Sequence, residues 1–246
     1  MENLLELCGL TASYQTPHGP GTAVDGASFI VRPGRSLGLI GESGCGKTSV
    51  GRAIMRVMPR NMRIDSGQIL FEGQDLVSLP EPVMRELRWR RIAMIPQSSM
   101  HSLDPVYRLE DQFLEVLCER GGLSKAAARI RARELFGLVG LDAGRLRHYP
   151  HEFSGGMKQR AVIAMALALQ PKLVIADEPV TALDVIVQEQ VLEVIRALQA
   201  WLGISVIMIT HDMSVVAQTC HDVVVMYAGN VVESGPVSII FRRPAH

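Results

Sequence analysis

Hydrophobic residues change their spacing along the chain, and the changes separate segments of different predicted structure. Between residues 4 and 94, runs such as 27–31 and 68–72 alternate between apolar and polar positions, which is typical of antiparallel strands. The next stretch is helical in pattern, with helices predicted at 109–117 and 124–139. A further helix is predicted after Thr48 and before Pro59, with an apolar stripe at Val50, Ala53, Ile54 and Val57.

Strands and helices alternate in the last third of the chain. The pattern predicts strands at 173–176, 204–210 and 223–227, and helices at 187–201 and 213–219. This alternation is the rhythm of βαβ units and therefore of a parallel sheet. We expect an α/β fold with a parallel sheet, an antiparallel part and a helical insert.

A glycine-rich sequence, GESGCGKT at 41–48, follows the apolar run 36–40. It fits the P-loop pattern G-x-x-x-x-G-K-[ST], in which glycine backbone N–H groups close around phosphate oxygens. The helix after it would direct its positive end at the same phosphates. Lys47 is then placed to reach the β/γ oxygens, and the Thr48 hydroxyl suits Mg²⁺.

Two adjacent acids, Asp177 and Glu178, follow the apolar run 173–176. Neighbouring carboxylates at the end of a buried strand repel each other unless a cation lies beside them. In P-loop enzymes one such acid holds Mg²⁺ and another group orients the attacking water. Asp177 is therefore a candidate metal ligand and Glu178 a candidate catalytic residue. An acidic strand end without a ligand is the simpler alternative.

A second anion-binding turn is predicted in FSGGMKQR, residues 153–160. Ser154 is a candidate N-cap, and Gly155 and Gly156 leave backbone N–H groups exposed at a helix start. One P-loop accounts for one nucleotide site, so the second turn suggests a dimer in which each chain covers its partner's nucleotide. The sequence S-G-G is common in loops, so an ordinary loop remains the alternative.

Together, these motifs resemble the nucleotide-binding subunit of an ABC transporter. GESGCGKT, Gln97, FSGGMKQR, LVIADEP, ALD and His211 stand in the order of the Walker A, Q-loop, signature, Walker B, D-loop and switch-histidine elements. The resemblance extends from Leu4 to about Phe241. The sequences YPHEFSGGMKQR and DEPVTALDV are most similar to the branch that imports peptides or nickel.

The resemblance implies ATP and Mg²⁺ as cofactors and assigns roles to named residues. ATP would be held by the Walker A residues Gly41, Glu42, Ser43, Gly44, Cys45, Gly46, Lys47, Thr48 and Ser49. The metal would be held by Thr48, Gln97 and Asp177. The catalytic residues would be Glu178, His211, Gln97 and Lys47.

Five further residues would contact the nucleotide or cross the dimer interface. Ser154, Gly155 and Gly156 would bind the γ-phosphate of the partner's nucleotide, and Asp184 would cross the interface. Tyr14 stands about where family members stack an aromatic ring on adenine; taken alone, it is equally a core or edge-strand tyrosine. Likewise, His211 and Gln97 alone would be ordinary polar residues after strands.

The same resemblance implies one ATP-binding domain over residues 1–246. Its core and antiparallel β subdomain would take 1–97 and 160–246, and a helical subdomain with the signature motif would take 98–159. The implied partners are transmembrane permease subunits, a second ATP-binding subunit and, indirectly, an extracytoplasmic substrate-binding protein. The chain would then act at the cytoplasmic face of the membrane. Family members often continue beyond the equivalent of residue 246, so we expect a short or shortened member.

Composition excludes some other functions. The chain carries 25 basic and 25 acidic residues, so no basic face for nucleic acid is indicated. Its four cysteines are scattered, which indicates reduced thiols in the cytoplasm. An ABC ATPase of DNA repair or translation, the main alternative, would usually carry a coiled-coil insert or a second cassette. A P-loop kinase or GTPase would lack the S-G-G signature.

Overall fold

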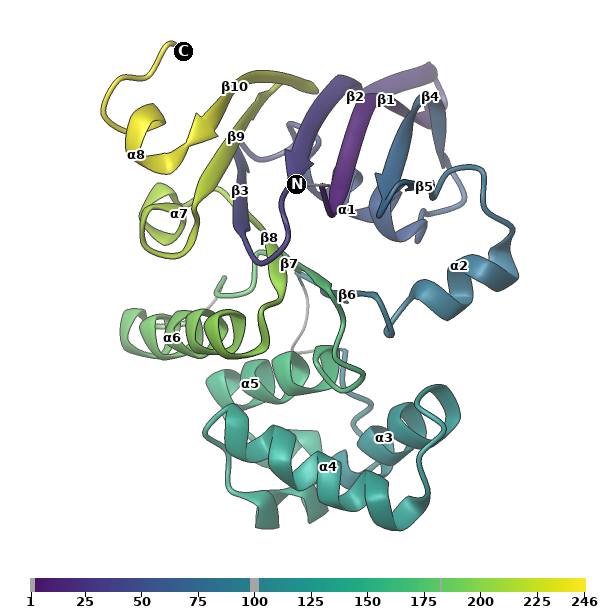
Figure 1. The fold of residues 1–246 in the computed structure, drawn as a ribbon, viewed down its shortest axis with the longest axis vertical. Coiled ribbons are helices and arrows are strands. Elements are labelled where there is room, and N and C mark those ends of the chain that lie inside the picture. Colours follow the sequence, from purple (N-terminus) through teal and green to yellow (C-terminus); the bar gives the residue numbers. More distant parts are fainter. Residues whose placement is uncertain (1–2, 98–101, 182) are drawn as a thin grey trace. The chain divides into compact units, whose positions relative to one another are not determined.

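The computed structural model describes residues 3–97, 102–181 and 183–246, and the chain divides into two compact units (Figure 1). The first unit is formed by Met1–Glu86 together with Ser205–His246. The second is formed by Leu87–Ile204. The first unit thus joins the two ends of the sequence, and the second is a continuous stretch between them.

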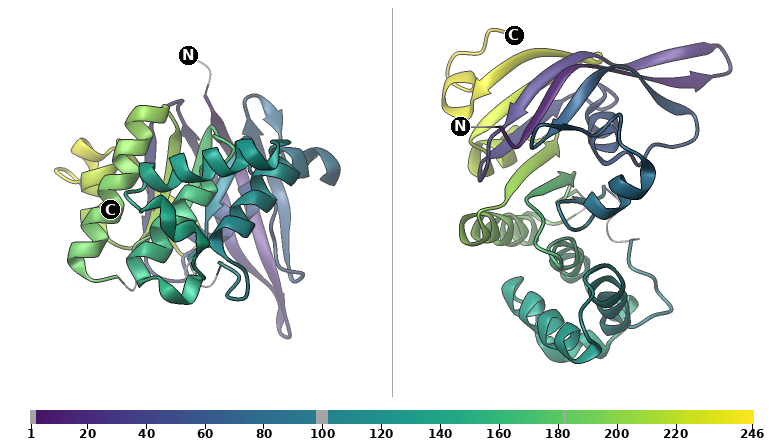
Figure 2. Two further views of the ribbon diagram at one scale, coloured as in Figure 1. Left: turned by 90° about the horizontal axis from the view of Figure 1, so that it is seen from below. Right: turned by 45° about the vertical axis from the view of Figure 1, so that its right-hand side comes forward.

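An antiparallel sheet occupies much of the first unit, as the alternating pattern predicts. Its strands are β1 (Leu5–Thr16), β2 (Gly19–Val31), β4 (Met62–Phe71) and β5 (Gln74–Asp75), in the order β2-β1-β4-β5. All of the pairs are antiparallel, and β1 and β2 run side by side up to the turn that joins them (Figure 2). Strand β1 therefore lies inside this sheet, with a hydrogen-bonded neighbour on each side.

The first unit also contains parallel strands. Strand β3 (Ser36–Gly41) pairs in parallel with β8 (Ser205–Thr210) and with β9 (Asp222–Tyr227). Strand β10 (Asn230–Pro236) adds to β9 in the antiparallel sense. All of β8 and all of β3 except Gly41 are buried, which explains why these strands are continuous apolar runs in the sequence.

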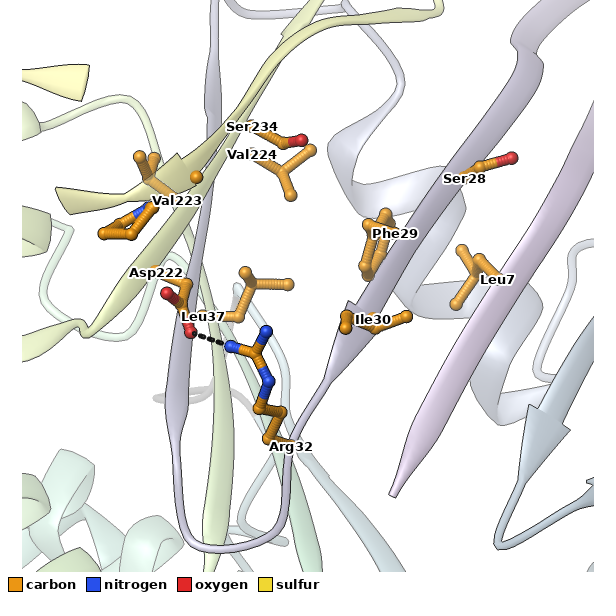
Figure 3. A pocket seen from close by; sticks show the side chains of 12 residues that line it. Leu7, Ser28, Phe29, Ile30, Arg32, Leu37, Asp222, Val223, Val224 and Ser234 are labelled. Carbon is orange, nitrogen blue, oxygen red and sulfur yellow. Dashed lines mark ion pairs between the residues drawn. The ribbon is translucent and has the colours of Figure 1, made fainter. Parts of the chain in front are cut away.

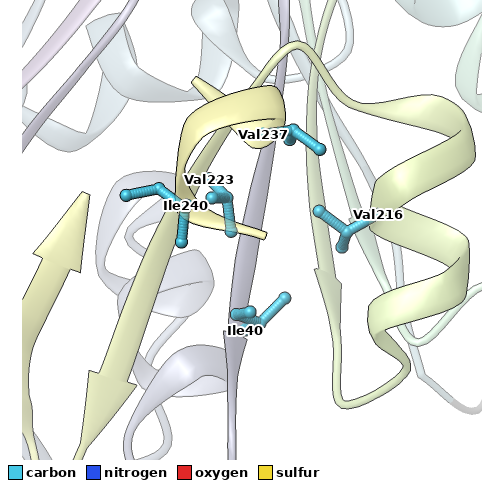
Figure 4. Packing of buried hydrophobic residues seen from close by; sticks show 5 residues of the cluster. All are labelled: Ile40, Val216, Val223, Val237 and Ile240. Carbon is cyan, nitrogen blue, oxygen red and sulfur yellow. The ribbon is translucent and has the colours of Figure 1, made fainter. Parts of the chain in front are cut away.

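Three helices accompany these parallel strands, and two of them pack into one apolar cluster. The helices are α1 (Lys47–Met55), α7 (Met213–Thr219) and α8 (Val237–Ile240). In Figure 4, side chains of β3, α7, β9 and α8 converge on one another, and the cluster consists of Ile40, Val216, Val223, Val237 and Ile240. Helix α7 approaches β3 closely, since a Cβ at Gly38 would lie 2.5 Å from Cγ1 of Val216.

The second unit is mainly helical and contains two parallel strands. Strands β6 (Ile92–Ile95) and β7 (Leu173–Asp177) pair with each other. The α-helices are α3 (Leu109–Glu115), α4 (Lys125–Leu138), α5 (Gly155–Ala166) and α6 (Val185–Leu202), with 3-10 turns at Ala143–Arg147 and Pro150–Glu152. Helix α2 (Glu81–Leu87) ends where this unit begins.

Packing between α3 and α4 follows from their apolar faces. The rings of Phe113 and Phe136 meet edge to face with centroids 5.4 Å apart, and both are fully buried. Ser124 caps α4 as predicted, because its side chain accepts a hydrogen bond from the N–H of Ala127 at 3.3 Å. These contacts make the segment between β6 and the signature sequence a helical body.

Two predictions about helix ends are wrong. The helix after Thr48 ends at Met55, because Arg56 adopts a left-handed conformation (φ 48°) and its N–H bonds back to Ala53 and Arg52. Val57 lies outside the helix and is 55% exposed, so it does not extend the packed stripe and Pro59 does not set the helix end. The helix predicted at 109–117 is α-helical only as far as Glu115, and a π-helical turn follows at Val116–Arg120.

Two further observations concern the cysteines and the helix lengths. Cys8, Cys45, Cys118 and Cys220 are all free thiols. Burial raises the pKa of the Cys220 thiol to about 12, so this thiol stays protonated at neutral pH. Among the described residues, no helix combines the length and the apolar character required to cross a bilayer.

Adjacent isoleucines on α8 provide a test of the apolar cluster. Ile240 is 8% exposed and packs in the cluster, whereas Ile239 is 56% exposed. We expect Ile240→Ala to lower the free energy of unfolding by about 2 kcal/mol, at the low end for a buried isoleucine, and Ile239→Ala by less than about 0.5 kcal/mol. Urea unfolding measures both, and equal losses would contradict the packing described.

Candidate functional site

The P-loop begins where β3 ends and stops where α1 starts. Gly41, Gly44 and Gly46 all have positive φ, at 152°, 85° and 104°. A Cβ at Gly41 would lie 2.1 Å from the carbonyl oxygen of Met226, and one at Gly46 would lie 2.2 Å from that of Ala23. Both positions therefore require glycine for space as well as for conformation. Nothing lies within 4 Å of a Cβ at Gly44, so the loop is open on that side.

Lys47 turns back into the loop that precedes it. Its Nζ donates hydrogen bonds to the carbonyl oxygens of Gly41 (2.7 Å) and Glu42 (2.8 Å), and lies 3.7 Å from Sγ of Cys45. Both Lys47 and Cys45 are buried, at 6% and 5% exposure. A positive charge is thus held at the centre of the glycine loop, beside the N-terminus of α1.

Tyr14 and His211 belong to the same unit as the P-loop. The Tyr14 hydroxyl lies 3.1 Å from Oγ of Ser49, which joins β1 to the first turn of α1. Tyr14 is half-buried on an interior strand, so it is not an edge-strand tyrosine. His211 is exposed and follows β8, whose last residue Thr210 pairs with Ile40 of β3. His211 and the P-loop therefore follow paired parallel strands at the same edge.

Gln97 and the two acids lie at the ends of two paired strands of the second unit. Ile95 of β6 pairs with Ala176 of β7, so the chain leaves both strands at one edge. Asp177 is 1% exposed and Glu178 is 9% exposed, while Gln97 is exposed. Residues 98–101, which follow Gln97, lie outside the described part of the chain.

A tight turn follows Glu178, and the sequence analysis did not identify its contact with the side chain. Glu178 has φ 49°, and its carbonyl oxygen accepts a hydrogen bond from the N–H of Thr181 at 3.3 Å. The Thr181 hydroxyl also donates to Oε2 of Glu178 at 2.8 Å. The available signal was a hydroxyl residue three positions after the acid, with Pro179 between them to favour a turn.

Ser154 and the signature glycines start helix α5. Oγ of Ser154 accepts a hydrogen bond from the N–H of Met157 at 3.4 Å, so Ser154 is the predicted N-cap. Gly156 has a second role that sequence reasoning missed: it is buried, and a Cβ there would lie 2.2 Å from Cγ1 of Val187. The signature turn is therefore packed directly against the first turn of α6.

Asp184 caps that same turn of α6. Its Oδ1 accepts a hydrogen bond from the N–H of Val187 at 3.0 Å, and its side chain is exposed. Val185 and Ile186, which follow it, are 82% and 73% exposed. Ala182 of the ALD motif lies outside the described residues. Capping gives Asp184 a local structural role whether or not it meets a partner chain.

A cavity in the first unit is separate from the predicted site residues. It has a volume of about 410 Å³, and apolar side chains of β1, β2, β3 and β9 face it (Figure 3). At its edge Arg32 and Asp222 form an ion pair, with Nη1 and Oδ2 3.5 Å apart. No residue predicted to bind the nucleotide lines this cavity.

Replacing Gly156 tests the contact between α5 and α6. We expect Gly156→Ala to lower the free energy of unfolding by about 1–3 kcal/mol, because the added methyl group overlaps a valine that is stiff in a helix. Gly137→Ala is the control: Gly137 is an exposed helical glycine with nothing within 4 Å, so this change should be neutral or stabilising. Adding Val187→Ala should recover much of the loss, and no recovery in this double variant would contradict the contact.

Comparisons with known proteins fit this arrangement. A family model described as ABC transporter matches residues 24–181. The oligopeptide transport ATP-binding protein OppD of Bacillus subtilis is 48% identical over 99% of this chain and 69% of its own length. The dipeptide transport ATP-binding protein DppD of Bacillus subtilis is 45% identical over 100% of this chain and 74% of its own.

Solved structures share the fold. A dimeric structure of the ATP-binding cassette MJ0796, in a post-hydrolysis state bound to ADP and Pi, has a TM-score of 0.84 at 23% identity. It covers 95% of this chain and 98% of that one. The structure of cbiO1 from Clostridium perfringens, part of the transporter complex cbiONQ, has a TM-score of 0.81 at 24% identity, over 99% and 92% of the two chains.

These relatives distinguish between the two functions that the sequence left open, a transporter subunit and an ABC ATPase of DNA repair or translation. The curated relatives are named as transport proteins, which does not support the alternative of an ABC ATPase in DNA repair or translation. The family match covers more than half of the chain, and the identity to transport subunits extends over nearly all of it. The chain belongs to the ABC transporter family.

Proposed function

We propose that this chain is the ATP-hydrolysing motor subunit of an ABC importer that carries peptides. One observation carries the proposal: a lysine-centred P-loop and a buried Asp177-Glu178 strand end occur in a chain whose relatives are named as oligopeptide and dipeptide transport proteins. Nickel chelates are the second cargo that the sequence resemblance allows. Peptide is preferred because both of these relatives carry that name.

The P-loop residues fit a triphosphate. The open side at Gly44 leaves room for phosphate oxygens, and the start of α1 supplies backbone N–H groups. Lys47 already lies in the loop with two carbonyl acceptors. Phosphate oxygens are stronger acceptors for an ammonium group than carbonyls are, so Lys47 would exchange these bonds on binding. The ring of Tyr14, held by its hydroxyl at Ser49, would stack on adenine.

The oxygen ligands suit Mg²⁺. A threonine hydroxyl and a carboxylate are hard ligands of the kind that Mg²⁺ prefers, and a carboxylate as buried as Asp177 is stabilised by a cation. Thr48 and Asp177 would hold the ion, with Gln97 sensing it. When bound, Mg²⁺ neutralises charge on the β/γ-phosphates.

Hydrolysis would depend on residues of this chain and of a second chain. Glu178 would orient the attacking water, while Lys47 and His211 stabilise charge on the γ-phosphate. Ser154, at the N-terminus of α5, would approach the γ-phosphate held by the partner chain. Asp184 lies next to exposed apolar residues at the start of α6, which suits a contact between chains.

The implied assembly follows from this composite site. Two ATP-binding subunits would close on Mg-ATP and part after hydrolysis, and this motion would drive transmembrane permease subunits. A peptide would be delivered by an extracytoplasmic binding protein. The chain would therefore act at the cytoplasmic face of the cell membrane.

Replacing Glu178 tests the catalytic assignment. We expect Glu178→Gln to lower kcat for ATP hydrolysis by about a hundredfold to ten-thousandfold, because a positioned general base is lost, while the Kd for ATP stays near that of wild type. Glu193→Gln, at an exposed glutamate of α6, is the control and should leave kcat unchanged. Near-normal turnover in Glu178→Gln would refute the role of Glu178.

The same variant tests the cargo in cells. A strain that lacks this subunit and requires an amino acid should regain growth on a peptide containing it when wild type is supplied. Glu178→Gln should not restore this growth. Failure of wild type to restore growth, together with recovery of nickel uptake, would overturn the peptide assignment.

A further inference from the structure

We infer that Thr181 is a positioning residue for Glu178: its hydroxyl holds the carboxylate in the orientation from which Glu178 acts on the attacking water. This inference rests on the proposed function, in which Glu178 is the residue that orients water. Thr181 itself contacts only the glutamate in this role and is not a catalytic residue.

Backbone geometry brings Thr181 back to Glu178. Strand β7 ends at Asp177, and Glu178 adopts a left-handed φ of 49°. The N–H of Thr181 bonds to the carbonyl oxygen of Glu178 at 3.3 Å, which closes a four-residue turn. Pro179 occupies the second position of that turn, where its fixed φ favours the bend. The turn places the side chains of its first and last residues together.

The side-chain contact is short and charge-assisted. Oγ1 of Thr181 donates to Oε2 of Glu178 at 2.8 Å. A glutamate has three rotatable side-chain torsions, and a bond to one carboxylate oxygen limits the rotation of the whole carboxylate. The donor is itself constrained, because a β-branched threonine has few χ1 rotamers. Glu178 is only 9% exposed, so the atoms packed around it leave its side chain few other orientations.

Thr181 also connects the acid to the start of α6. After the turn, the N–H of Leu183 bonds to the carbonyl oxygen of Val180 at 3.3 Å. Asp184 then caps α6 through the N–H of Val187. The hydroxyl that holds Glu178 therefore belongs to the short segment that ends at Asp184, the residue proposed to meet the partner chain. Between Glu178 and Asp184, backbone hydrogen bonds at Thr181 and Leu183 hold the chain in a local turn.

A purely structural role for Thr181 makes a different prediction. The turn is closed by the backbone N–H of Thr181, which any residue except proline provides. Thr181→Val keeps that bond and the branched shape but removes the hydroxyl. If Thr181 only supports the turn, this variant retains turnover; if the hydroxyl positions Glu178, it does not.

The experiment compares Thr181→Val, Thr181→Ser, Glu178→Gln and wild type as full chains. For Thr181→Val we expect kcat for ATP hydrolysis to fall about tenfold to a hundredfold, with KM for ATP and Tm nearly unchanged. Thr181→Ser keeps the hydroxyl and should recover most of kcat. Thr16→Val is the matched control, since the exposed Thr16 hydroxyl also donates one hydrogen bond, to Gly19 at 2.7 Å; its kcat should be that of wild type.

The outcomes separate the inference from the proposed function. Normal turnover in Glu178→Gln would refute the catalytic role of Glu178 given under the proposed function, and with it the basis of this inference. Loss of turnover in Glu178→Gln with wild-type kcat in Thr181→Val would overturn only the role of Thr181, as would a Thr181→Ser variant as slow as Thr181→Val. If Thr181→Val lowers Tm, Thr181→Ala is measured in its place, and the same fall in kcat is expected.

A double variant adds an independent test. Once Glu178→Gln has removed the carboxylate, Thr181→Val should cause no additional fall in kcat, because its effect acts through that group. A second, equal fall in the double variant would contradict the inference.

Discussion

Parallel pairing of buried strands is the constraint on which the candidate site depends. In the first unit, hydrogen bonds between β3 and β8 bring the P-loop and His211 to one edge. In the second unit, the pairing of β6 with β7 does the same for Gln97 and the two acids. The P-loop, Gln97, Glu178 and His211 all lie just beyond the ends of strands whose residues are mainly apolar and buried, so the sheet fixes positions and the loops supply the chemistry.

Much of this arrangement was predictable because it is encoded locally. Apolar runs marked β3, β7 and β8, and small polar residues marked helix starts such as Ser124 and Ser154. No strand is predicted at Asn230–Pro236, where intermediate and exposed residues leave a weak pattern. The predicted helix after Thr48 extends too far, to Val57, because apolar periodicity does not reveal that Arg56 turns left-handed.

The contacts that escaped prediction depend on how segments meet. Gly156 looked like an anion-binding glycine, yet the structure also requires it to be small because Val187 lies against it. Thr181 has no role predicted from the sequence, yet its hydroxyl holds the carboxylate of Glu178. Both contacts lie in the second unit and involve the segment from Glu178 to the first turn of α6. The acid, Asp184 and the signature turn are therefore parts of one packed structure.

We propose that each nucleotide site is completed by a second chain. The most direct measurement is the size in solution of Glu178→Gln with and without Mg-ATP, because slow hydrolysis should preserve the nucleotide-bound state. We expect a monomer without nucleotide and a dimer with Mg-ATP. A protein that binds Mg-ATP but stays monomeric at saturating nucleotide would contradict a site shared between two copies of this chain.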